Sequence, residues 1–269
     1  MTDPMLPSVK AHWERDGLSE AIRRALDASG LDLTSLTVDD LAPLDQFHGG
    51  GLAFTRRLAM LGGLGPGMRV LDVGGGLGGP ARTLALEYGC RVTVLDLTES
   101  YVEAGRMLTS LVGLDDRVDF LVGNALALPF GADTFDAVWT QNSGMNIADK
   151  AGLYAGFHRV VRPGGRLVTQ EPMAGPVQPP DYPQMWADDP STDHIRPPDE
   201  MRAVIEAAGF TVLEWSDVWI DRPPPDAPRP AHTVQSLVMG DDRVAEIMRA
   251  SRRNQNEGRV VMVHAVCTA

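Results

Sequence analysis

From about residue 68 onward, hydrophobic residues alternate between short apolar runs and longer segments with helical spacing. The apolar runs predict seven strands, at 69–73, 91–95, 117–121, 134–140, 166–170, 211–219 and 259–267. Helical spacing predicts helices that begin near residue 81 and that cover 101–111, 150–161 and 198–208. Strands that alternate with helices are typical of an α/β fold with a parallel, doubly wound, Rossmann-like sheet.

The first 63 residues show helical spacing and form an N-terminal helical flank, which we expect to be part of a lid. Helices are predicted at 19–28 and 52–61, with a short turn at 38–44. Residues 64–269 then form the main ligand-binding domain.

Two segments interrupt the main domain. Residues 172–198 are rich in Pro and Asp, and residues 222–257 begin with a proline cluster and continue as a helix. Long connections inside a compact domain are commonly functional lids. We therefore expect both segments to form a helical and Pro-rich cap over the site.

The stretch between the first strand and the first helix carries the clearest chemistry. The strand leads into Asp72, glycines follow at 74, 76 and 78, and Pro80 opens the helix. Glycines let backbone N–H groups approach a ligand, and proline suits the first turn of a helix. The pattern predicts an edge that holds a nucleotide-like molecule.

Two cofactors are compatible with this loop. Gly74-x-Gly76-x-x-Gly79 fits the dinucleotide fingerprint, which places a pyrophosphate on a helix N-terminus. A carboxylate just before the loop, Asp72, would repel a pyrophosphate and attract a cation. S-adenosylmethionine carries an ammonium and a sulfonium, so we favour it over a nicotinamide dinucleotide.

Polar groups also follow the next two strands. Asp96 lies 20 residues beyond Gly76, where an acidic group can accept bonds from both ribose hydroxyls. The alternative is that Asp96 or Thr98 caps the following helix. After the third strand, Asn124 could bond an adenine amino group and the Ala125 N–H a ring nitrogen, although alone this segment reads as an ordinary turn.

Five segments come in the order and spacing of the class I S-adenosylmethionine-dependent methyltransferases, at 70–82, 95–101, 123–130, 134–141 and 157–165. The chain resembles the branch of that family that methylates small molecules, including glycine-derivative, phosphoethanolamine and natural-product methyltransferases. The resemblance covers about residues 45–268. It implies a seven-stranded sheet with the last strand antiparallel.

The resemblance also implies roles for residues at the strand ends. It assigns the methionine end of the cofactor to Asp72, Gly74 and Gly76, the ribose to Asp96 and Leu97, the adenine to Asn124 and Ala125, and the amino group to Gln141. Gly75 stands where relatives often have Cys or Ser, a change from which we expect no effect. Asn142 stands where many relatives have a His directly after the Gln.

Asp45-Gln46-Phe47-His48 precedes a glycine run, and the resemblance places it over the cofactor. With an unperturbed pKa of about 6.5, His48 is our candidate for taking a proton from the acceptor. The alternative is a hydrogen-bonded histidine that shapes the entrance. Gln46 and Asp45 would orient His48 or the cofactor.

Predicted acceptor contacts come from two places. Asn142, Met145 and Asn146 follow the fourth strand, at the sheet edge where open α/β sheets bind ligands, although Met145 would also suit the core. Trp186 and His194 belong to the cap, and one or two of the aromatic residues Trp13, Tyr182, Trp186, His194 and His232 would line an apolar pocket. We expect no metal ion.

The amino-acid composition limits the kinds of molecule that the protein is expected to bind. The chain has 24 Lys and Arg against 36 Asp and Glu, a net charge of −12, which argues against nucleic acid and anionic membranes. Two cysteines in 269 residues, with no metal or redox spacing, fit a reducing cytoplasm. Neither a secretory signal nor a bilayer-spanning run is seen. Formation of a homo-oligomer stays open.

These observations predict an enzyme that moves a methyl group from S-adenosylmethionine to an oxygen, nitrogen or carbon of a small organic acceptor, with S-adenosylhomocysteine as product. Three alternatives remain. They are a methyltransferase-fold cyclase or isomerase that uses the cofactor structurally, a nicotinamide-dependent oxidoreductase, and a binding protein without turnover.

Overall fold

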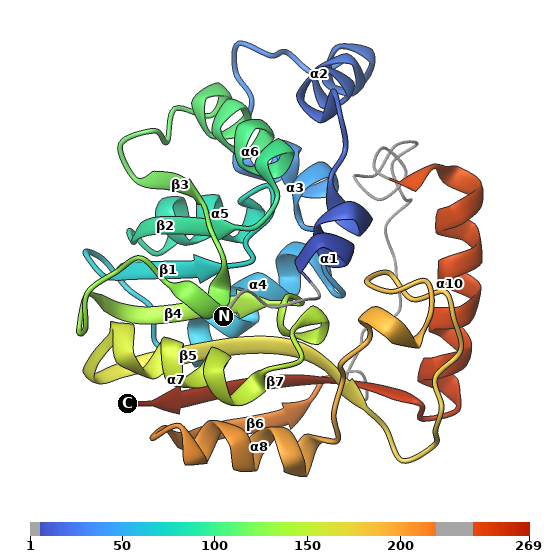
Figure 1. Cartoon of the computed structure of the whole chain (residues 1–269). Helices are drawn as coiled ribbons and strands as arrows, with labels where there is room; N and C mark the ends of the chain where they lie inside the picture. Colours follow the sequence, from blue (N-terminus) through green and yellow to red (C-terminus); the bar gives the residue numbers. More distant parts are fainter. Residues whose placement is uncertain (1–5, 219–238) are drawn as a thin grey trace.

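The computed structural model describes residues 6–218 and 239–269 (Figure 1). A seven-stranded sheet has the order β3-β2-β1-β4-β5-β7-β6. The strands are β1 (Arg69–Val73), β2 (Arg91–Asp96), β3 (Val118–Val122), β4 (Phe135–Gln141), β5 (Val161–Ala174), β6 (Thr211–Asp217) and β7 (Val260–Thr268). Pairing from β3 across to β5 is parallel, and β7 runs antiparallel to β5 and β6. The predicted fold class is confirmed.

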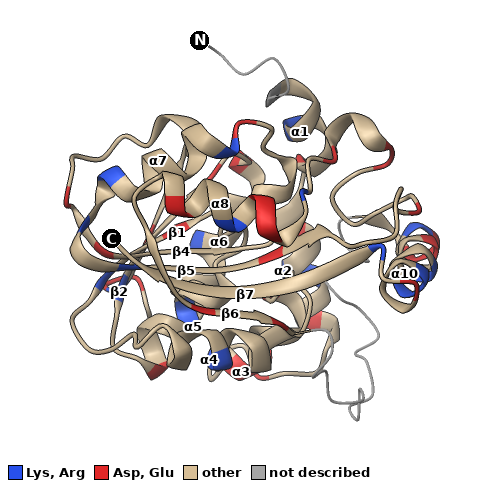
Figure 2. Cartoon of the chain, turned by 90° about the horizontal axis from the view of Figure 1, so that it is seen from below, with Lys and Arg blue, Asp and Glu red and all other residues tan. Residues whose placement is uncertain are grey.

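Helices cover both faces of the sheet, which is why strands such as β1 are buried along most of their length. On one face lie α7 (Lys150–Val160) and α8 (Pro198–Ala207), and on the other lie α4 (Gly51–Leu61) and α5 (Gly79–Glu87) (Figure 2). Helix α6 (Glu99–Leu111) contacts β2 and β3. All the helices predicted after residue 68 are present within a few residues of their expected bounds.

The N-terminal flank contains α1 (Leu6–Trp13), α2 (Leu18–Ala28) and α3 (Val38–Asp45) ahead of α4. The prediction of a turn at 38–44 is wrong, because this segment is helix α3. Thr37 and Asp40 form a capping box, in which the Thr37 hydroxyl accepts from the Asp40 N–H and the Asp40 carboxylate accepts from the Thr37 N–H. This cap supports a helix despite the internal Pro43.

The two predicted cap segments differ from their expected bounds. Residues 172–174 belong to β5, and the chain from 175 to 197 is a loop with one short 3₁₀ turn, η3 (Pro190–Thr192). Of the second segment, the structure describes α10 (Asp241–Asn256). Its proline cluster and His232 lie outside the described residues. Within the described ranges, no helix is long and apolar enough to cross a membrane.

Candidate active site

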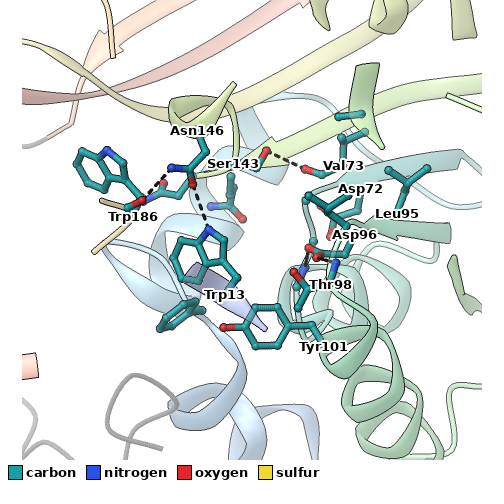
Figure 3. Close-up of a pocket in the computed structure, with 18 of the residues that line it drawn as sticks. Trp13, Asp72, Val73, Leu95, Asp96, Thr98, Tyr101, Ser143, Asn146 and Trp186 are labelled. Atoms are coloured by element: carbon teal, nitrogen blue, oxygen red, sulfur yellow. Dashed lines mark hydrogen bonds between the residues drawn. The ribbon is translucent and has the colours of Figure 1, made fainter. Parts of the chain in front are cut away.

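A cavity lies at the carboxyl ends of β1, β2 and β4, with α1 on one side and the 185–186 segment on another (Figure 3). It brings together most of the predicted site residues. Those that line it are His48, Asp72, Gly74, Gly76, Asp96, Leu97, Asn124, Ala125, Gln141, Asn142, Met145, Asn146 and Trp186. The parallel strands explain this gathering, since their carboxyl ends meet at one edge of the sheet.

Asp72, at the cavity end of β1, is fully buried. Neither of its carboxylate oxygens has a hydrogen-bond partner among the described residues. Burial, with a smaller contribution from the nearby Asp96, raises the pKa of Asp72 to about 8. An orphaned carboxyl that lines a cavity is suited to a cationic group, so the residues present fit the ammonium and sulfonium of S-adenosylmethionine.

The glycine loop is shaped around Asp72. A Cβ on Gly75 would lie 2.6 Å from the Asp72 Oδ2, so a larger residue there would displace the carboxyl group or the loop. The expectation that Gly75 in place of Cys or Ser has no effect stays a prediction. Gly74, with a φ of 68°, lets Ser143 pack directly against the loop, because a Cβ on Gly74 would lie 2.3 Å from the Ser143 Cβ.

Asp96 holds the other side of the loop. Its Oδ2 accepts from the Gly76 N–H and its Oδ1 from the Thr98 N–H, both at 2.9 Å. Thr98 itself makes no side-chain cap to α6. Each Asp96 oxygen keeps a second lone pair for a ligand hydroxyl, so these bonds leave its predicted ribose role open.

His48 belongs to a polar network rather than facing the cavity alone. Its Nε2 lies 2.9 Å from the Gln46 Oε1 and 3.1 Å from the Thr55 hydroxyl, and its Nδ1 lies 3.2 Å from the Gly49 carbonyl. Burial lowers the pKa of His48 to about 4, so the ring is neutral at pH 7. The Thr55 hydroxyl also lies 3.2 Å from the Gln141 Oε1, which connects His48 to the end of β4.

Two predicted contacts do not line the cavity. Gln46 lies behind His48, where its Oε1 accepts from Thr55 at 2.8 Å, so it supports the wall instead of forming it. The backbone N–H of His194 donates to the Met145 carbonyl at 2.9 Å, which places His194 against the outside of the short 3₁₀ turn η2 (Gly144–Asn146).

Aromatic side chains form the remaining wall. Trp13 packs edge-on against Phe47 at 5.6 Å and lies 6.5 Å from Tyr101, between ring centroids. Trp186 and Met145 are also buried there. Trp13 was among the aromatic residues of which one or two were predicted to line an apolar pocket, whereas Tyr101 was not predicted at the site. The signal for Tyr101 was its position one turn into the helix that follows Asp96.

Asp45 also has a different partner from the one expected. It lines the cavity, but its Oδ2 pairs with the Arg82 guanidinium at 2.8 Å, and both side chains are fully buried. Arg82 is part of α5, so this ion pair joins the N-terminal flank to the helix that follows the glycine loop. No role for Arg82 was predicted from the sequence.

Comparison with known proteins identifies relatives of this architecture. A methyltransferase-domain family model matches residues 71–169. A methyltransferase of Streptomyces halstedii, GfsG, is 32% identical over an alignment of 227 positions that covers 78% of this chain and 77% of that protein. A glycine/sarcosine/dimethylglycine N-methyltransferase of Actinopolyspora halophila is 36% identical over 119 residues, 44% of this chain and 21% of that one.

Solved structures share the fold. The geranyl diphosphate C-methyltransferase of Streptomyces coelicolor, crystallised with S-adenosylhomocysteine, superposes with a TM-score of 0.71 at 20% identity and covers 99% of this chain and 98% of its own. The [4+2]-cyclase SpnF has a TM-score of 0.63 at 23% identity, with 80% of each chain covered. Because the relation to GfsG spans most of both proteins, the chain belongs to the class I S-adenosylmethionine-dependent methyltransferases and transfers a methyl group to a small molecule.

Proposed function

We propose that the acceptor of this methyltransferase is an uncharged, largely hydrophobic small molecule. The observation that carries this proposal is the makeup of the cavity wall. Aromatic residues and methionines supply much of its surface, namely Trp13, Phe47, Tyr101, Met145, Met185 and Trp186. Among the described lining residues, the charged side chains are aspartates, and neither Lys nor Arg occurs.

This wall favours a neutral acceptor for an electrostatic reason. A phosphate or carboxylate brought into a buried site needs a cationic or multiple-donor partner, because desolvating an unpaired charge is costly. The Asp96 carboxylate would instead repel an anion, and Arg82 is already paired with Asp45. An apolar acceptor gains from burial against the aromatic wall.

For the cofactor we propose the placement implied by the family. Asp72 and the glycines at 74 and 76 would hold the methionine end, Asp96 and Leu97 the ribose, and Asn124 and Ala125 the adenine. The support is that these residues line one continuous cavity and that the Asp72 carboxyl is buried without a partner. The Asn124 Oδ1 already accepts from the Leu126 N–H at 2.9 Å and keeps a second lone pair, which would accept from the adenine amino group.

Bound S-adenosylmethionine supplies an electrophilic methyl group, which an acceptor atom attacks in line as the carbon–sulfur electron pair leaves on sulfur and the acceptor loses a proton. The protein's share is to align the two reactants and to exclude water. Trp13 and Trp186 supply part of that exclusion, since both are aromatic parts of the wall.

His48 stays our candidate for receiving the proton. Its neutral ring is in the correct protonation state, but both nitrogens lie within hydrogen-bond distance of protein groups. The alternative prediction, a cyclase or isomerase on the same fold, would need neither this proton transfer nor methyl transfer. SpnF, described as a [4+2]-cyclase, shows that such a reaction occurs on this fold.

A paired acceptor screen tests the proposal. The protein is incubated with S-adenosylmethionine and with hydrophobic alcohols, phenols, amines and alkenes, each alongside its phosphorylated or carboxylated counterpart. We expect S-adenosylhomocysteine to form with neutral members and at least about tenfold more slowly with their anionic counterparts, since an unpaired buried charge costs more than ~1.4 kcal/mol. Faster turnover of the anionic members would contradict the proposal, and a product of unchanged mass without S-adenosylhomocysteine would favour the cyclase.

We also propose that the protein works in the cytoplasm without a nucleic-acid partner. Support comes from the net charge of −12 and from Cys90 and Cys267, which are buried free thiols. Whether it acts as a homo-oligomer is a separate question, which light scattering of the purified protein would answer.

A further inference from the structure

Asn146 joins three segments that are far apart in the sequence. Its Nδ2 donates to the Trp186 carbonyl at 2.8 Å, and its Oδ1 accepts from the Trp13 Nε1 at 3.1 Å (Figure 3). The Nδ2 also donates to the Thr192 carbonyl at 2.9 Å. The side chain is buried and also lines the cavity. Both amide donors and the amide oxygen are therefore engaged within the protein.

The same three segments meet at further contacts around Asn146. His12, next to Trp13 in α1, has its Nε2 3.1 Å from the Met185 carbonyl. On the cap side, the Trp186 Nε1 donates to the Asp193 carboxylate at 2.9 Å, and the Tyr182 hydroxyl donates to the same carboxylate at 2.8 Å. The cap loop is thus folded on itself and connected to α1.

Helix α1 is also held on the opposite side of the cavity. The Glu14 carboxylate accepts from the Ser100 N–H at 3.1 Å, and the Ser100 hydroxyl accepts from the Arg15 N–H at 3.3 Å. Ser100 lies in α6, next to Tyr101 of the cavity wall. Helix α1 therefore spans from α6 to the cap loop, and Trp13 and Val9 face the cavity beneath it.

We propose that Asn146 is a positioning residue that latches α1 and the cap loop together, so that the two walls close over the ligands and release them as one unit. The inference rests on the proposed function, because it takes this cavity to hold the cofactor and the acceptor. It gives Asn146 a role beyond the predicted acceptor contact, since each of its polar atoms is already engaged within the protein.

The chemistry of the amide explains why asparagine occupies this position. Two carbonyls and one indole N–H meet there, and only a group with two donors and an acceptor satisfies all three at once. An aspartate would keep the bond from Trp13 but face two carbonyls with a negative charge. An alanine would leave all three partners without this side chain in a buried site, at a desolvation cost.

Whether the latch is closed can be measured without knowing the acceptor. Helix α1 has eight residues, and an isolated helix of that length is marginal in water, so protection of its amides depends on tertiary contacts. Hydrogen–deuterium exchange of α1 in the free protein reports whether the latch is closed. The dissociation rate of S-adenosylhomocysteine, the probe ligand, reports whether the cavity is covered.

The test compares Asn146→Ala, Trp13→Phe and the double variant. We expect amide exchange in α1 and S-adenosylhomocysteine dissociation to be about tenfold faster for Asn146→Ala and about threefold faster for Trp13→Phe, which loses one hydrogen bond and keeps an aromatic ring. Because both changes break the same latch, the double variant should resemble Asn146→Ala to within about twofold.

Two controls match these changes. Asn254→Ala removes another buried asparagine, which fixes the cap loop to α10 at the Asp181 backbone, five residues before Trp186, and lies away from the cavity wall. Trp215→Phe makes the same tryptophan replacement in β6. Both should lower stability without faster exchange in α1.

The proposal is overturned if α1 exchanges at the wild-type rate in both Asn146→Ala and Trp13→Phe, if Asn254→Ala accelerates it equally, or if the effects of the two single changes multiply in the double variant. Should Asn146→Ala fail to fold, the exchange rate of α1 in Trp13→Phe decides alone. An exchange rate equal to that of the wild type then overturns the proposal. If the wild-type protein binds no S-adenosylhomocysteine, the proposed function fails, while exchange in α1 still measures the latch.

Discussion

At the scale of single residues, the site depends on one carboxyl group and on the space left for it. Asp72 is buried without a hydrogen-bond partner among the described residues. Because Gly75 has no side chain, the Asp72 Oδ2 occupies space that a Cβ at position 75 would fill. In the free protein the burial cost keeps Asp72 mostly protonated at pH 7, since its pKa is raised to about 8. A bound cation would favour the ionised form, so ligand binding and proton release are coupled.

This coupling predicts the behaviour of Asp72→Asn, which keeps the shape and removes the charge. We expect wild-type protein to release close to one proton on binding S-adenosylmethionine at pH 7 and its affinity to fall as pH drops below about 8. The variant should bind at least about tenfold more weakly and release none, as one lost charge–charge contact predicts. Calorimetry in two buffers of different ionisation enthalpy measures both quantities.

The pH dependence of folding stability has the opposite sign to the pH dependence of cofactor affinity, and this difference serves as an internal check. Because the folded pKa lies above the unfolded value of 3.8, wild-type stability falls as pH rises from about 4 to about 8, and Asp72→Asn should lack that part of the dependence. Asp119→Asn, on the exposed side of β3, is the matched control and should leave affinity unchanged. Equal affinity of Asp72→Asn and wild type would remove Asp72 from the cofactor site.

At the scale of elements, strands with strong local signals formed where they were expected, and β1 shows why. Its apolar run ends at glycines, and both faces of the sheet are covered, so burial and turn chemistry agree on its ends. Helix α3 shows the opposite case. A proline and two aspartates favour a turn at 38–44, yet a capping box and burial of Leu41 and Leu44 hold the segment as a helix.

The capping box of α3 can be tested by removing one hydroxyl. Thr37→Ala should lower the free energy of unfolding by about 1 kcal/mol, because the Asp40 N–H loses its acceptor at the first turn of the helix. Urea denaturation measures the change. Thr37→Ser keeps the hydroxyl and should stay within about 0.5 kcal/mol of wild type. A loss as large in Thr37→Ser as in Thr37→Ala would show that the threonine methyl group, and not the cap, stabilises α3.

At the scale of the whole molecule, buried polar contacts connect the N-terminal flank to the methyltransferase domain. The ion pair between Asp45 and Arg82 is the most deeply buried of them, and Arg82 also donates to the carbonyls of Leu77 and Gly105. Residues 1–63 were predicted as a separate flank of the lid, and this pair gives them a fixed attachment beside the glycine loop. This attachment helps to hold α1 over the cavity.

Asp45→Asn should therefore destabilise the protein by about 3 kcal/mol, since it leaves the Arg82 charge buried without a counterion. Glu206→Gln breaks the exposed pair with Arg202 and should cost less than about 0.5 kcal/mol. Chemical denaturation of both variants under one set of conditions makes the comparison. A loss in Asp45→Asn no larger than in Glu206→Gln would mean that the buried pair contributes little to the attachment.

Local patterns in the sequence by themselves determined the order of strands and helices, the glycine loop after Asp72 and the acidic residue at the end of β2. Such features depend on neighbours along the chain: side-chain periodicity, turn residues and strand ends. From these the parallel sheet follows, and with it the edge where the strand ends gather. That is why most predicted cofactor contacts line one cavity.

Only the tertiary structure decided which side chains engage one another across that cavity. Asn146, predicted to contact the acceptor, lines the cavity and also joins Trp13 to Trp186. Asp45, predicted to orient His48 or the cofactor, pairs with Arg82. These partners lie dozens of residues apart, and their meeting depends on how α1, α3 and the cap loop pack. Local patterns carry no information about such contacts, because the free energy of a buried polar group is determined by the partners that folding brings to it.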